Sequence, residues 1–169
     1  MNRVLLASAA LLLLLPAAGA MAKSTDRNQA MTIDSGSQSG NMEGNGKTVL
    51  GGGVAVTQGS LEIKSSAAGI YMADGEISRS IFTGKQVKMR QQMDDGSWMD
   101  AQADRVEYDM KTETITFIGN YTVKSDRGSN SGQRMVYNTK SGNMQSGGDG
   151  TRVRTVIQPK SAAPAQGKN

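Results

Sequence analysis

The sequence offers few side chains for covalent chemistry. Neither histidine nor cysteine occurs among its 169 residues, which excludes His-dependent triads, thiol nucleophiles and the usual zinc sites. The remaining candidates are four carboxylates that could act as the paired acids of a glycosidase: Asp94, Asp95, Asp100 and Asp104. Most of them lie in a stretch typical of a hairpin turn, where aspartate serves turn geometry. We therefore predict no catalytic residue, no metal site and no cofactor, and an enzyme is the weaker alternative.

The N-terminus has the layout of a secretory signal peptide. Arg3 provides the positive charge, residues 4–15 form an apolar run with seven leucines, and small residues follow Pro16. A membrane anchor is the alternative, but the run is short for a hydrocarbon core of about 30 Å. We predict cleavage after Ala22, with cleavage after Ala20 as the alternative, and a periplasmic location for the mature chain.

The mature chain would contain 147 residues, which suits one domain. Its 18 basic and 15 acidic residues are interspersed and leave a net charge of +3, so no basic stripe indicates nucleic-acid binding. Only two leucines remain, whereas Val, Ile and nine Met supply most of the apolar side chains. This composition favours strands over helices. A largely disordered secreted protein is the alternative, because a chain with few strongly apolar side chains has little surface to bury on folding.

Apolar and polar residues alternate with a period of two through most of the chain, as strands with one buried face require. Turn signals separate the runs at residues 73–75, 94–97, 110–113, 126–128 and 140–142. No helical segment stands between them, so we predict an all-β fold, a sandwich, jelly roll or barrel. Alternation alone places these residues on the inward face: Leu50, Val54, Val56, Ile63, Ile70, Met72, Val87, Val106, Phe117, Val123, Met135 and Tyr137.

Two stretches of the chain resemble each other. Residues 48–56, TVLGGGVAV, align with residues 115–123, ITFIGNYTV, so that Gly119 follows Gly52 by 67 residues. A shorter similarity relates residues 105–108 to residues 134–137. Repeated hairpins of this kind stack into a solenoid-like sheet, although chance similarity is the alternative for so few matched residues.

The predicted inward face is rich in methionine and poor in Phe and Leu. Large apolar residues total 35 of the 147 in the mature chain, enough for a thin core or for one left open as a groove. Methionine adapts to changing apolar partners, and exposing a chain of about twelve carbons to water costs on the order of 10 kcal/mol. A groove that shelters acyl chains is therefore our interpretation, with an ordinary sandwich core as the alternative.

Several segments, taken in order, resemble the OstA-like family of lipopolysaccharide-transport proteins over roughly residues 28–159. The most specific is GVAVTQG at residues 53–59, which precedes the alternating Leu61 and Ile63. The others are MTIDS at 31–35, NMEG at 41–44, Tyr108, FIGN at 117–120 and TRVRTVI at 151–157. The chain departs from the family pattern at residues 51–53, where three glycines suggest a bulge, and at Met89, where an aromatic residue is expected.

The resemblance implies a twisted, open, V-shaped β-jelly roll of antiparallel strands over residues 23–159. The composition of the last residues, rich in Ala, Pro, Gln and Lys, predicts a disordered tail at 160–169. It implies a lipopolysaccharide carrier that bridges the inner and outer membranes and holds lipid A acyl chains between two sheets. Residues carried over as lipid-binding are Met31, Ile33, Met89, Tyr108 and Met110, and those known only from alternation join them in this role.

The implied partners are lipopolysaccharide, LptC at the inner membrane, LptD with LptE at the outer membrane, and further copies of the chain itself. Pairing would be head to tail, through open strand edges. The first strand, near residues 30–35, and the last, residues 151–158, would form these edges through the following residues: Ala30, Thr32, Asp34, Val153, Thr155 and Ile157. A structural or adhesion protein that uses the same edges without a ligand is the alternative.

Overall fold

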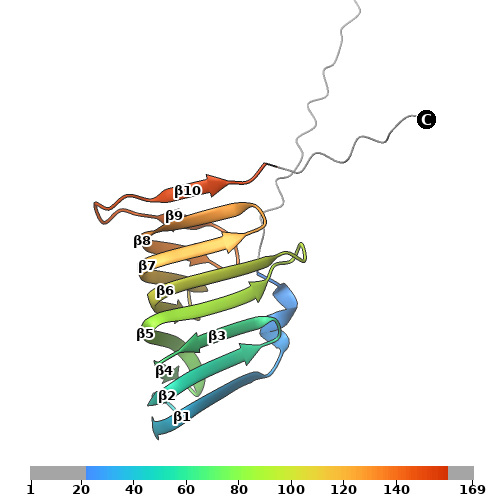
Figure 1. Cartoon of the computed structure of the whole chain (residues 1–169). Helices are drawn as coiled ribbons and strands as arrows, with labels where there is room; N and C mark the ends of the chain where they lie inside the picture. Colours follow the sequence, from blue (N-terminus) through green and yellow to red (C-terminus); the bar gives the residue numbers. More distant parts are fainter. Residues whose placement is uncertain (1–21, 160–169) are drawn as a thin grey trace, which may run out of the picture.

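The computed structural model describes residues 22–159, which form an antiparallel sheet of ten strands and a single turn of 3-10 helix, η1 (Ser24–Asn28) (Figure 1). The described residues contain no α-helix. The strands are β1 (Met31–Gly40), β2 (Lys47–Gln58), β3 (Leu61–Ser65), β4 (Ala67–Ala73), β5 (Glu76–Gln92), β6 (Trp98–Asp109), β7 (Thr114–Ser125), β8 (Gly128–Asn138), β9 (Met144–Ser146) and β10 (Arg154–Ile157). The expected all-β, antiparallel, open V-shaped jelly roll is confirmed.

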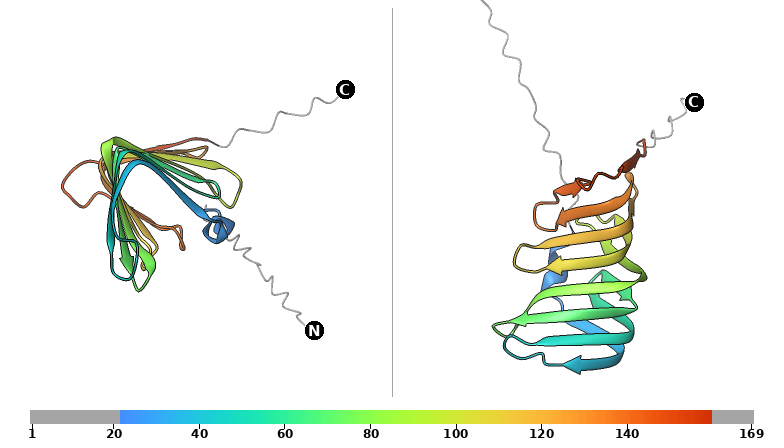
Figure 2. Two further views of the ribbon diagram at one scale, coloured as in Figure 1. Left: turned by 90° about the horizontal axis from the view of Figure 1, so that it is seen from below. Right: turned by 90° about the vertical axis from the view of Figure 1, so that its left-hand side faces the viewer.

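The strands stack in the order β1-β2-β3-β5-β6-β7-β8-β10, with β4 between β2 and β5 and with β9 on β8. Seen along the stack, the sheet is bent into a V (Figure 2, left). We call the two limbs half-sheet A, which contains β3 and β10, and half-sheet B, which contains β4 and β9. Most long strands run through both: β2, for example, pairs with β4 through residues 47–50 and with β3 through residues 54–58. One continuous sheet thus replaces the two separate sheets that the resemblance implied.

The bend follows a line of pairing irregularities that we call the crease. The register shifts between Ser35 and Ser37 in β1, and further along the stack at residues 83–87, 102–105 and 118–121. Between β3 and β4 the chain simply breaks pairing at Ser66, whose N–H still donates to the Thr83 carbonyl at 3.0 Å. Because a bulge bends and twists a strand, aligned bulges fold the whole sheet.

Glycines with positive φ make the crease possible on two strands. Gly52 (φ 72°) and Gly53 (φ 87°) provide it in β2, where the three glycines had suggested a bulge, and Gly119 (φ 77°) with Asn120 (φ 44°) provides it in β7. A side chain at Gly52 would also meet the Cα atom of Gly36 at 3.1 Å. The internal repeat therefore marks two equivalent crossings of the crease.

The ends of the sheet differ from the predicted strand limits. Ala30 precedes β1, which continues to Gly40, well beyond the expected end near residue 35. At the other end, β10 begins only at Arg154, so Val153 lies outside it, and Asp149 accepts hydrogen bonds from the Thr151 N–H (3.0 Å) and hydroxyl (2.6 Å) just before it. Ala30 and Val153 each lie one residue outside β1 and β10, respectively, whereas Thr32 and Asp34 lie in β1 and Thr155 and Ile157 in β10.

A short N-terminal segment is attached to the end of half-sheet A, on the open side of the V (Figure 2, left). Ala22 pairs with Met93, and the Lys23 N–H donates to the Gln92 carbonyl at 3.0 Å. The buried Asp26 of η1 accepts a hydrogen bond from Ser60. The predicted signal peptide up to its cleavage site, and the predicted tail at 160–169, lie outside the described residues apart from Ala22.

Candidate functional site

The space between the two half-sheets is lined by the predicted inward face. Of the seventeen residues predicted to bind lipid, eleven are buried: Leu50, Val54, Val56, Ile63, Ile70, Val87, Met89, Val106, Phe117, Met135 and Tyr137. Five more pack against this cluster as half-buried side chains, namely Met31, Ile33, Met72, Tyr108 and Val123, and Met110 is also half-buried. The structure therefore brings the predicted residues together in one apolar interior.

The interior is nearly filled at the end next to β1. Here Met31 and Ile33 of β1 face Tyr108 and Met110 across the V, and Phe82 closes the space between them. The remaining cavity is about 10 Å³, roughly the room that one water needs. Four of the five residues carried over from the family resemblance meet at this N-terminal end, and the fifth, Met89, is buried elsewhere in the same core.

The opposite end, next to β10, contains a cavity of about 240 Å³ with a mostly apolar lining. Four methionines line it: Met93, Met99, Met135 and Met144. Val123 and Tyr137 complete its apolar wall, while Ser97, Ser125 and Arg127 stand in the lining as its polar groups. This volume approaches the lower limit of about 300 Å³ for small-molecule pockets, so the C-terminal end has room that the N-terminal end lacks.

Of the residues that line this cavity, the predictions included only Val123, Met135 and Tyr137. Met93 continues the period of two set by Val87 and Met89, and Met99 begins the one that continues at Ala101 and Ala103, so alternation could have identified both methionines. Met144 lies in β9, a three-residue strand too short to show a period. Arg127 lies in a turn and carries no sequence signal that points to a site.

Both outer strands of the sheet end it with a free edge. β1 pairs only with β2 among the described strands, and β10 pairs only with β8, through residues 154–157. Ile157 is 80% exposed, and the neighbouring Val156 is 38% exposed. Neither β1 nor β10 contains a proline, one of the features that usually block further pairing at an edge.

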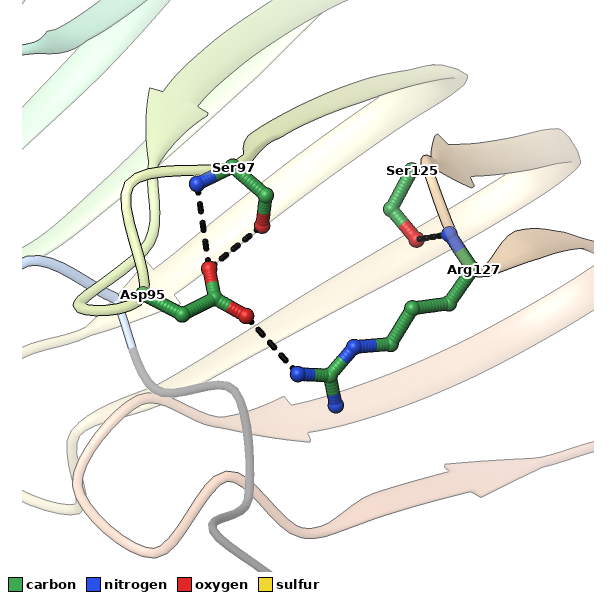
Figure 3. A network of polar contacts seen from close by, with 4 residues as sticks. All are labelled: Asp95, Ser97, Ser125 and Arg127. Carbon is green, nitrogen blue, oxygen red and sulfur yellow. Dashed lines mark hydrogen bonds and ion pairs between the residues drawn. The ribbon is translucent and has the colours of Figure 1, made fainter. Parts of the chain in front are cut away.

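The four candidate catalytic aspartates have separate structural partners. Asp94 accepts from the Ser24 N–H at 2.9 Å, Asp100 pairs with Arg90 at 3.5 Å, and Asp104 accepts from Asn120 at 2.8 Å. Asp95 accepts from Ser97 and pairs with Arg127, as Figure 3 shows. Because each carboxylate serves a turn, a ladder or the crease, none is matched with another as an acid–base pair.

Charged residues cover the outside of the V. Glu62, Arg90, Asp100 and Lys124 occupy one row across four strands of half-sheet A, with alternating sign. On half-sheet B, partial burial would raise the pKa of Glu107, but hydrogen bonds from Arg79 and Arg105 outweigh burial and hold this pKa below its usual value. The polar outside and the apolar inside make the sheet strongly two-faced.

Among residues 22–159, no group of three or more acidic side chains is arranged to hold a metal ion. Within the same range, no helix is long and apolar enough to cross a membrane.

Comparisons with known proteins agree with this geometry. The chain is 31% identical over 160 residues to the lipopolysaccharide export system protein LptA of Haemophilus influenzae, covering 92% of each chain. It is 30% identical to the protein of the same name in Escherichia coli K12, covering 88% of this chain and 86% of that one. The crystal structure of LptH from Pseudomonas aeruginosa, described as the LptA-homologous periplasmic component of a lipopolysaccharide transport device, superposes with a TM-score of 0.71. The identity to LptH is 23%, over 80% of this chain and 99% of the other.

The relatives are named as transport proteins, which confirms the prediction that the chain is not an enzyme. The profile of the family described as "LptA/(LptD N-terminal domain) LPS transport protein" matches residues 32–143, most of the bent sheet. A two-faced sheet, an apolar interior, close relatives and the family profile lead to one conclusion: this chain belongs to the LptA/LptD N-terminal-domain family of lipopolysaccharide transport proteins.

Proposed function

We propose that the chain is a periplasmic carrier that binds lipopolysaccharide and shelters lipid A acyl chains between its two half-sheets. One observation carries the proposal: the apolar residues of both half-sheets face one interior, and this interior has free volume at its C-terminal end. Each methylene group moved from water into this lining gains about 0.8 kcal/mol. The methionine side chains there can rearrange around a chain that enters and leaves.

We further propose that copies of the chain assemble head to tail, with β1 of one copy pairing with β10 of the next. The same edges would accept LptC at the inner membrane and LptD with LptE at the outer membrane, so that the assembly bridges the two membranes. The free edges of β1 and β10, with the exposed Val156 and Ile157, support this arrangement. The export signal predicted before residue 23 supports the periplasmic location.

Photo-crosslinking in cells tests the carrier proposal. A photoreactive residue at Tyr137, which lines the C-terminal cavity from β8, should capture lipopolysaccharide. One at Lys88, which is exposed on the outer face of β5, should not. Equal capture at both positions would contradict binding in the interior. If no lipid co-purifies with the chain and none raises its Tm, the alternative of a ligand-free structural protein gains support.

Concentration-dependent native mass measurement tests the assembly proposal. The chain should form longer species as its concentration rises, and Ile157→Lys should prevent them, because a charge at a strand edge opposes pairing. Lys140→Gln, in a turn away from both edges, is the matched control and should assemble like the unchanged chain. Assembly that persists in Ile157→Lys would exclude pairing through β10.

A further inference from the structure

Arg127 stands at the rim of the C-terminal cavity, where charge and apolar surface meet. It contributes to the lining of the 240 Å³ cavity together with the methionines, and also to an adjoining depression of about 180 Å³ that extends to Val156 and Ile157. Ser125 and Met144 line both spaces as well. Among residues 22–159, Arg127 is thus the one cationic residue in the lining of these two adjoining spaces, which extend from the interior to the β10 edge.

The guanidinium is held in place by the neighbouring turn. Its Nη2 atom lies 2.8 Å from Oδ2 of Asp95, while Oδ1 of Asp95 accepts from the Ser97 N–H at 3.0 Å and from its hydroxyl at 2.5 Å (Figure 3). The backbone N–H of Arg127 donates a hydrogen bond to the Ser125 hydroxyl at 3.3 Å. Asp95 therefore fixes the position of Arg127 through one of its five N–H donors.

The Arg127 side chain remains 61% exposed in spite of this ion pair, and Asp95 is 37% exposed. An exposed pair of this kind contributes little to folding stability, at most about 1 kcal/mol, and its partner can be exchanged. A phosphate offers bidentate geometry that matches a guanidinium. An apolar cavity with one cation at its rim fits a molecule with a hydrocarbon chain and an anionic end.

We propose that the C-terminal cavity is a binding site for a phosphorylated amphiphile, with the hydrocarbon chain among the four methionines and the phosphate on Arg127. Asp95 holds the guanidinium ready in the empty site and gives it up to the phosphate. This inference rests on the proposed carrier function and sharpens it, because it assigns a binding residue to the headgroup and a place for it beside β10.

Titration of the mature chain with dodecyl phosphate below its micelle concentration tests this site. With methyl-labelled methionine, the NMR signals of Met93, Met99, Met135 and Met144 should shift and saturate. The signals of Met31 and Met110, which line the filled end, serve as internal references. Dodecyl maltoside, which has the same chain and a neutral head, measures the contribution of the cavity alone.

Three variants separate the charge from the cavity. Arg127→Gln should weaken dodecyl phosphate binding about tenfold, as expected for a lost charged hydrogen bond, and leave dodecyl maltoside unchanged. Asp95→Asn should strengthen dodecyl phosphate binding, because it removes the competing carboxylate. Arg90→Gln, on the outer face of the same half-sheet, should change neither.

Two results would overturn the inference: shifts confined to the reference methionines, or equal loss of both detergents in Arg127→Gln. If a photoreactive residue at Tyr137 still captures lipopolysaccharide in such a case, the carrier proposal stands and only the assignment of the headgroup fails. If neither detergent nor lipopolysaccharide binds, the carrier proposal fails together with this site.

Discussion

The two ends of the interior are built from the same kind of strand but are packed in opposite ways. At the N-terminal end, Phe82 and Tyr108 leave a cavity of about 10 Å³, whereas four methionines at the C-terminal end leave about 240 Å³. The crease differs in the same sense. At one end Gly36 and Gly52 approach each other closely. Further along, the Asn120 side chain donates a hydrogen bond to Asp104 and accepts one from Gln133. Filled space and free space are thus separated within one sheet.

The two ends of the interior contribute differently to folding and to binding. Buried area at the N-terminal end contributes to folding, because its side chains touch one another without gaps. Apolar surface around the C-terminal cavity contributes less to folding, and it is available to a hydrocarbon chain. Matched variants at the two ends test whether stability resides at the filled end and binding at the end with free volume.

The largest expected effect comes from truncating the filled end. Phe82 is 2% exposed, so Phe82→Ala should lower the free energy of unfolding by about 3–5 kcal/mol. Met99, at 7% exposed beside the free volume, should cost about 2 kcal/mol as Met99→Ala. Urea unfolding monitored by circular dichroism measures both. Equal losses would show that the two ends are packed alike.

A smaller effect is expected from the crease. Gly52→Ala should cost about 2 kcal/mol, because alanine is strained at φ 72° and its Cβ would press on Gly36. Asn120→Gly loses side-chain bonds to Asp104 and Gln133 but accepts its positive φ, so we expect less than about 1 kcal/mol. The same unfolding assay measures both variants, and a larger loss for Asn120→Gly would place the rigid part of the crease at its C-terminal end.

The smallest effect concerns the outer carboxylates in acid. The pKa values of Glu107 and Asp95 lie below their ordinary values of 4.5 and 3.8, so the unfolded chain takes up protons first as the pH falls. The stability that these two carboxylates contribute is therefore fully present above about pH 5, and it is lost as the pH falls through their lowered pKa values. Glu107→Gln should flatten this loss more than Asp95→Asn, since Glu107 bonds two arginines. Both effects should stay below about 1 kcal/mol, and Tm measured from about pH 2 to 7 tests their order.

Much of the fold could be predicted because alternation is a local property. Met31, Ile33 and their counterparts on β6 and β7 follow a period of two, and the structure buries that face. The crease could be recognised only in part. In β5 the buried positions change from even at Phe82 to odd at Val87, a break in phase that becomes meaningful only when neighbouring strands break at the same level.

The C-terminal cavity could not have been predicted from the pattern. A cavity volume is the space that the backbone encloses minus the space that the side chains fill. Neither of these two volumes can be deduced from the residue pattern of a single strand. Arg127 belongs to a turn whose place beside Asp95 depends on pairing between β6 and β7. The exact limits of the outer strands could not be predicted for a similar reason, because the start of β10 at Arg154 depends on its pairing with β8.

The long strands that pass through the crease without a break have a mechanical consequence. β5, β6, β7 and β8 each belong to both limbs, and ladder hydrogen bonds tie each of these strands to the next. A change in the angle of the V at one of these strands must therefore be shared by the strands paired with it. A ligand that pushes the half-sheets apart at one end would therefore strain the backbone of these paired strands along the stack.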